Sequence, residues 1–215
     1  LYHMMRGGVS VEKVPSLKPV LAQAGVSALP KANVAVLVGT ALDPTKARRP
    51  QNLPGVTINT LWGEMAAQLA ISAGKPELYE YVKEADKKGV SPGSEALKNL
   101  FDACAPSLVL MDELVAYARN IYGKEGLPSG TYDSFLVFIQ QITEAARASK
   151  NSMVVASIPE SEIEINGEEK GEISSGKRAL EQIEHTFGRM ESIWKPVTAG
   201  EGFEIVRRRL FLDCK

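Results

Sequence analysis

Three short apolar runs constrain the fold of this chain more than any other feature. Each run holds four or five consecutive apolar residues with no polar alternation, as strands buried on both faces of a parallel sheet do. Amphipathic helical repeats separate the runs, such as Leu61, Met65 and Leu69 at a spacing of four. The alternation predicts an α/β fold with a parallel sheet, not a sandwich or a bundle. The predicted strands that contain these runs are residues 33–40, 107–113 and 152–159, and a fourth short strand is predicted at 191–197.

Composition narrows the class of protein. At 215 residues, 44% hydrophobic and 24% charged, the chain has room for one or two globular domains. The formal net charge of -1 gives no global field that would favour nucleic acid or membrane partners. Cys104 and Cys214 lack metal-ligand spacing, and two histidines cannot form a histidine-based metal cluster. Reduced thiols, no signal peptide and apolar runs of about five residues predict a cytoplasmic protein without a membrane partner.

An acidic pair ends the second predicted strand, in Ser107-Leu-Val-Leu-Met-Asp112-Glu113. This pattern is typical of the Walker B strand of ATPases, which delivers carboxylates to the carboxyl end of a parallel sheet, where ligands bind. We therefore expect Asp112 to hold Mg²⁺ and contact the nucleotide, and Glu113 to orient or deprotonate the attacking water. The alternative is a strand end with two solvated acids.

Two further residues fall in the order found in AAA+-type P-loop ATPases. Ser157 ends the third strand, which matches the sensor 1 position that hydrogen-bonds the γ-phosphate or the water; the alternative is a hydroxyl that caps the strand. Arg189 resembles an arginine finger, which reaches the nucleotide of a neighbouring subunit. A surface salt bridge with Glu184 or Glu191 is the alternative.

Several segments of the chain carry a resemblance to one family. They are Leu61–Ala66, Ser91–Leu97, Asp112–Arg119, Glu201–Phe211 and, less specifically, Asp133–Leu136. Together these segments resemble the predicted AAA+ ATPases of Domain of Unknown Function 499, and the resemblance covers nearly the whole chain. It implies large prokaryotic ATP-binding proteins, often encoded near DNA methyltransferases and helicases in phage-defence neighbourhoods. It also implies a homo-oligomer, with DNA or defence-system proteins as partners and with ATP and Mg²⁺ as cofactors.

The phosphate-binding motif Gly-x-x-x-x-Gly-Lys-[Ser/Thr] does not occur in this chain. Gly171 to Arg178 has the glycine and lysine spacing, but it ends in arginine where a hydroxyl should meet Mg²⁺. The family resemblance places the missing motif just before Leu1. We therefore expect a fragment of a three-layer P-loop NTPase (AAA+-like) sheet that lacks its first strand and phosphate loop. Such a fragment should be inactive and bind ATP negligibly, which nucleotide-dependent thermal stabilisation would contradict.

The predicted organisation is a partial ATPase core over residues 1–197, with an acidic insertion at 160–176 and the start of a lid helix at 198–215. Within the core, Ser91-Pro92 predicts one helix start and Thr131 another. In its complete form the protein is expected to bind and hydrolyse ATP, driving remodelling or DNA-linked work. The alternatives are an ATP-dependent switch or scaffold, and an interaction module that does not hydrolyse ATP.

The basic clusters of the chain are predicted to be solvated; the alternative is that they contact the phosphate backbone of a nucleic acid. They are Lys46 to Arg49, in a proline-rich loop, and Arg207 to Arg209, on the polar side of the lid helix. One arginine of the second cluster could still face nucleotide.

Overall fold

A three-stranded parallel sheet organises the chain in the computed structural model. The strands lie in the order β1-β2-β3, with Val38 opposite Asp112 and Met111 opposite Ala156. The predicted α/β class with a parallel sheet is therefore confirmed, while the P-loop type of the sheet stays a prediction. The strands are β1 (Asn33–Val38), β2 (Ser107–Asp112) and β3 (Ser152–Ala156).

The structure describes most of the chain up to the end of the sheet. The described residues are 2–7, 10–14, 17–158, 181 and 183. Outside them lie the predicted acidic insertion, the segment from Gly171 to Arg178, Arg189, the predicted strand at 191–197 and the lid helix. Within this part of the chain, no helix has the length and apolar character that crossing a membrane requires.

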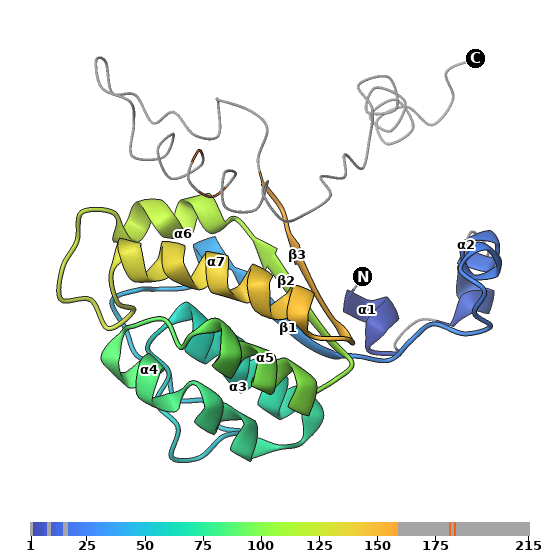
Figure 1. Ribbon diagram of the computed structural model, residues 1–215, viewed down its shortest axis with the longest axis horizontal. Helices are drawn as coiled ribbons and strands as arrows, with labels where there is room; N and C mark the ends of the chain where they lie inside the picture. Colours follow the sequence, from blue (N-terminus) through green and yellow to red (C-terminus); the bar gives the residue numbers. More distant parts are fainter. Residues whose placement is uncertain (1, 8–9, 15–16, 159–180, 182, 184–215) are drawn as a thin grey trace.

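The larger helices lie on one side of the sheet (Figure 1). Consecutive strands are also neighbours in space, so right-handed crossovers place both connections on the same face. The first connection contains η2 (Gly39–Ala41), α3 (Leu61–Ala73), η3 (Pro76–Tyr81), α4 (Lys83–Lys88) and α5 (Ser94–Ala103). The second contains α6 (Leu114–Ile121) and α7 (Tyr132–Ala148). Before β1 come α1 (Tyr2–Met5), η1 (Val11–Lys13) and α2 (Leu17–Gln23).

The core forms between the sheet and these helices. Alternate strand residues such as Leu37 and Val109 are fully buried in it, together with Trp62 of α3 and Phe138 of α7. The rings of Trp62 and Phe138 lie 5.5 Å apart, centroid to centroid. The burial of these large side chains, each contributing roughly 1.5–3 kcal/mol or more, orients α3 and α7 on the sheet.

Side chains of α3 terminate the sheet at β1. The Gln68 amide accepts a hydrogen bond from the Val36 N–H (2.7 Å) and donates one to the Val36 carbonyl (2.9 Å). The Ser72 hydroxyl oxygen accepts another from the Val34 N–H (3.1 Å). An edge strand exposes such groups to pairing with another chain, so these bonds close this edge.

A buried carboxylate sets the start of α3. Asp86 is fully buried and accepts hydrogen bonds from the backbone N–H and hydroxyl of Thr60 and from the hydroxyl of Tyr79. A Cβ on Gly63 would lie 2.0 Å from an Asp86 oxygen, so this position needs glycine. Thr60 in turn caps α3 by accepting from the Gly63 N–H (3.1 Å).

The helix-start predictions have different outcomes. Thr131 is the N-cap of α7, as expected, and accepts from the Ser134 N–H (3.1 Å). The prediction for Ser91 is wrong, because α5 begins at Ser94 with Gly93 as its N-cap. The Ser91 hydroxyl instead donates to the Gln141 amide oxygen, which also accepts from the Gly93 N–H.

Candidate functional site

The carboxyl ends of the three strands bring four polar residues together. Asp112 is the last residue of β2, and Glu113 follows it. Ser157 lies one residue beyond β3 and still donates its N–H to the Met111 carbonyl (2.9 Å), so its position is fixed by the sheet. Thr40 lies in η2, directly after β1. In an open α/β sheet this edge is where ligands bind.

Asp112 joins the second and third strands at this edge. One oxygen of its exposed carboxylate, Oδ1, accepts hydrogen bonds from the Ser157 hydroxyl and from the Glu113 N–H (3.0 Å). The other oxygen, Oδ2, takes part in neither bond. The sequence placed Asp112 and Ser157 at this edge, and the structure brings their side chains into contact.

Glu113 has an unusual backbone conformation. Its φ of 55° and ψ of 33° are left-handed, which is uncommon for a residue other than glycine and costs of order 1 kcal/mol or more. It occupies the N-cap position of α6, and its carbonyl accepts from the Ala116 N–H (3.1 Å). The backbone turn directs the exposed side chain toward β1, where Oε2 accepts a hydrogen bond from the Thr40 hydroxyl.

The approach of β1 to Glu113 depends on Gly39. A Cβ at this position would lie 2.1 Å from the Glu113 carbonyl oxygen and 3.1 Å from the Cβ of Tyr117. No side chain larger than hydrogen fits without movement of the backbone. Gly39 and Thr40 end the predicted strand at 33–40, but the sequence did not predict their contact with Glu113. The one partial signal was a hydroxyl residue at the end of a strand that precedes the acidic pair along the chain.

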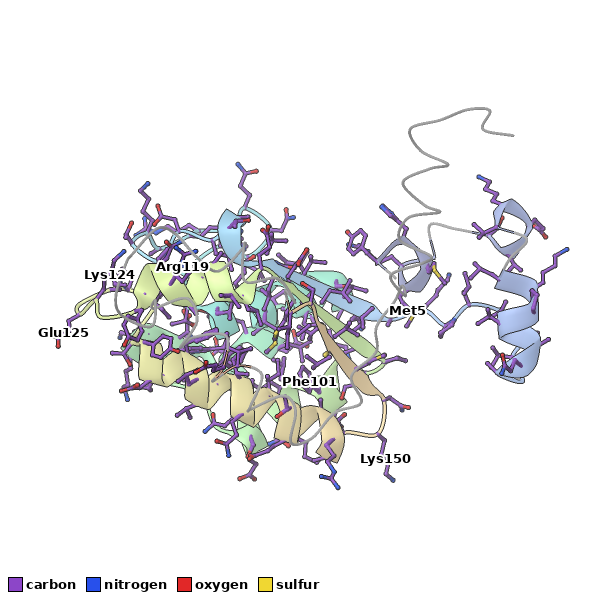
Figure 2. All side chains as sticks on the ribbon, turned by 90° about the horizontal axis from the view of Figure 1, so that it is seen from above. Met5, Phe101, Arg119, Lys124, Glu125 and Lys150 are labelled. Carbon is purple, nitrogen blue, oxygen red and sulfur yellow. The ribbon has the colours of Figure 1, made fainter. Side chains whose placement is uncertain are left out.

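The fourth predicted site residue, Arg189, lies outside the described residues. Among the other basic residues, Arg119 is exposed in the last turn of α6, and Figure 2 labels it together with Lys124 and Glu125, which follow this helix. Glu125 projects into solvent at the end of the molecule in this view.

The chemistry of this edge suits a hard cation. A carboxylate and a hydroxyl are oxygen ligands of the kind that Mg²⁺ prefers. Across the described residues, no group of three or more histidine, cysteine, aspartate or glutamate side chains could hold a metal ion.

Comparison with known proteins gives one finding. A model of the DUF499 N-terminal domain matches residues 2–194. No curated protein and no solved structure matches the chain. The match spans most of the 215 residues and includes every strand and helix described above, so the chain belongs to the DUF499 family.

Proposed function

We propose that this chain is part of an AAA+-like ATPase core that binds and hydrolyses ATP together with a phosphate-binding loop. The observation that supports the proposal best is the acidic pair Asp112-Glu113 at the carboxyl end of the middle strand, with the Ser157 hydroxyl bonded to Asp112. Parallel strands that end in carboxylates and a hydroxyl at one edge suit a nucleotide and its metal ion.

Each residue has a distinct role in the proposed mechanism. When bound, Mg²⁺ supplies neutralisation of the charge on the phosphate oxygens. Asp112 would hold the ion, directly or through water; its Oδ2 lies outside the bonds to Ser157 and Glu113. The single O–H of Ser157 donates to Asp112 in the structure, and in the nucleotide-bound state it would turn toward the γ-phosphate or the attacking water. Glu113 orients that water and accepts its proton.

Thr40 belongs to the same proposal. Its hydroxyl donates to Oε2 of Glu113, so the direction of the carboxylate is fixed by η2 while Oε1 is outside this bond. A general base must lie within hydrogen-bond reach of the proton that it removes. Thr40 is therefore a positioning residue for Glu113.

The work driven by hydrolysis is proposed from family resemblance. We infer remodelling of, or movement on, DNA or a partner protein, in a phage-defence setting. In a homo-oligomer, Arg189 would contact the nucleotide of the neighbouring subunit, where a guanidinium stabilises charge on the transferred phosphoryl group.

Replacing Glu113 by Gln tests the enzyme proposal. The experiment uses the protein that contains both this core and a Gly-x-x-x-x-Gly-Lys loop. Glu113→Gln should lower the steady-state ATP hydrolysis rate at least about 100-fold, because an amide cannot accept the proton, while bound ATP is retained. Phosphate release and ATP retention on the purified protein measure both effects.

Glu125→Gln is the matched control, because Glu125 is exposed and lies beyond the far end of α6. It should leave hydrolysis unchanged. If Glu113→Gln also leaves turnover unchanged, the enzyme proposal is wrong and the ATP-dependent switch takes its place. If the parent protein does not bind ATP at all, an interaction module without nucleotide remains.

A further inference from the structure

A cavity lies beside the candidate site, between the segment that follows β1 and the start of α3. Its volume is about 240 Å³, below the roughly 300–1,000 Å³ of pockets that hold drug-sized ligands. The wall nearest the site contains Ala41, which follows Thr40, and Tyr117, one helical turn after Glu113. Apolar side chains of Leu42, Ile58 and Leu61 form another part of the lining.

The carboxylates of this cavity already have partners. Oε2 of Glu64, whose side chain is 9% exposed, accepts from Nε (2.7 Å) and Nη2 (2.5 Å) of Arg48, and Oε1 accepts from the Gln68 amide (2.8 Å). Asp43 accepts from the N–H and hydroxyl of Thr45 and pairs with Lys46 at 3.0 Å. These contacts lower the pKa of Asp43 to about 2, with the Thr45 hydroxyl as the largest cause.

The cations keep donors that these pairs do not use. A guanidinium has five N–H donors, and the Nη1 group of Arg48 takes part in neither bond to Glu64. An ammonium has three, and the Lys46 side chain is 79% exposed although it pairs with Asp43. The unused N–H donors therefore belong to the cations Arg48 and Lys46, whereas each oxygen of the Glu64 and Asp43 carboxylates already has a partner.

The loop that carries these cations is held in place. Arg48 and Ile58 exchange two backbone hydrogen bonds of 2.8 Å each, which joins the two ends of the segment between them. Leu53, within this segment, is buried. The guanidinium is thus presented from a backbone fixed at both ends, which lowers the entropy cost of binding.

We propose that this cavity binds a small molecule that carries a carboxylate or phosphate group. The anionic oxygens meet Arg48 and Lys46, and the rest of the molecule packs against Leu42, Ile58 and Leu61. Charge-assisted bonds to a guanidinium supply the specificity for an anion. The site is separate from the acidic edge formed by Asp112 and Glu113, and binding here does not depend on ATP hydrolysis.

Calorimetric titration of the 215-residue chain tests the proposal. The probes are phenyl phosphate and benzoate, which combine an anion with an apolar body, inorganic phosphate, and phenol as the neutral control. We expect saturable binding of one molecule of phenyl phosphate or benzoate per chain and none of phenol. Inorganic phosphate should bind more weakly, because it lacks the part that packs against the apolar wall. The comparison of phenyl phosphate with benzoate identifies the preferred anionic group.

Two variants identify the site. The double variant Arg48→Gln with Glu64→Gln removes the cation without leaving a buried carboxylate unpaired, and should weaken binding at least tenfold. Lys46→Gln changes an exposed side chain, so it keeps the fold and should also weaken binding. The control is Arg49→Gln, because Arg49 is a neighbouring exposed cation that does not line the cavity. This variant should not weaken binding. The proposal is overturned if neither phenyl phosphate nor benzoate shows saturable binding. It is also overturned if Arg49→Gln weakens binding as much as the variants of Arg48 and Lys46 do.

Discussion

At the scale of single residues, the contact between Gly39 and Glu113 decides the geometry of the candidate site. A Cβ on residue 39 would lie only 2.1 Å from the Glu113 carbonyl oxygen. Because this close approach brings η2 against the start of α6, the Thr40 hydroxyl reaches the Glu113 carboxylate. A glycine that does no chemistry therefore determines where the proposed general base lies.

Gly39→Ala should lower the free energy of unfolding by about 3 kcal/mol, the upper end of what overpacking costs, because the atom it meets belongs to backbone. Urea unfolding of the 215-residue chain measures the loss. The control is Gly126→Ala, where no atom lies within 4 Å of the added Cβ and only a left-handed φ of 70° opposes it. In Gly126→Ala, the free energy of unfolding should fall by about 1 kcal/mol. Equal losses would show that the contact with Glu113 does not matter.

The residues of the site differ in how far sequence could predict them. Asp112 and Ser157 end apolar runs, and parallel pairing alone brings such strand ends to the same edge of the sheet. The contact of Thr40 with Glu113 depends on the left-handed backbone of Glu113, which no local pattern encodes. Arg189 stays a prediction, since it lies outside the described residues.

At the scale of secondary-structure elements, α3 does more than cover the sheet. Its polar residues Gln68 and Ser72 bond the outer backbone groups of β1, so the sheet cannot extend on that side. Gln68 also donates to Glu64, which pairs with Arg48 of the loop before α3. The helix therefore connects the closed edge of the sheet with the wall of the cavity.

Gln68→Leu should destabilise the fold by about 1–3 kcal/mol, because the N–H and carbonyl of Val36 lose their side-chain partner. Chemical denaturation followed by circular dichroism measures the change. Gln140→Leu makes the same substitution at an exposed position of α7, where the amide donates to Glu144 of the same helix. It should change stability by less than about 0.5 kcal/mol. If both variants behave alike, the closure of the β1 edge does not stabilise the sheet.

Helix starts illustrate which local signals hold at this scale. Thr131 caps α7 because its hydroxyl needs only the backbone of its own helix. Ser91 does not start α5, because its hydroxyl is engaged by Gln141, a residue 50 positions away in the sequence. Local chemistry predicts a cap correctly only where no distant partner competes for it.

At the scale of the whole molecule, buried groups of the core make the free energy of unfolding depend on pH in the alkaline range. Cys104 is 1% exposed, and burial raises the pKa of its thiol from 9.0 to about 11. The unfolded chain therefore releases this proton at lower pH than the folded chain. The stability contributed by the neutral thiol is complete below pH 9.0 and is lost as pH rises toward 11.

We expect the melting temperature of the wild-type chain to fall above pH 9. In Cys104→Ala, the melting temperature should not show the part of this fall that lies between pH 9 and 10. Burial also raises the pKa of Tyr117 and of Tyr132 to about 12, so both proteins should lose further stability above pH 10. Scanning calorimetry at several pH values measures the difference between them. An unchanged slope in Cys104→Ala between pH 9 and 10 would contradict the assignment.

The sequence by itself determined the class of fold and the strand ends that could carry chemistry. Apolar runs separated by helical repeats predicted a parallel sheet, and parallel strands bring Asp112 and Ser157 to one edge. The tertiary structure alone decided the bond between Thr40 and Glu113, the closure of the β1 edge by Gln68, and the pairing of Arg48 with Glu64. These contacts join residues that are 16 to 73 positions apart. The packing of helices on a sheet sets their distances, which local propensity does not encode.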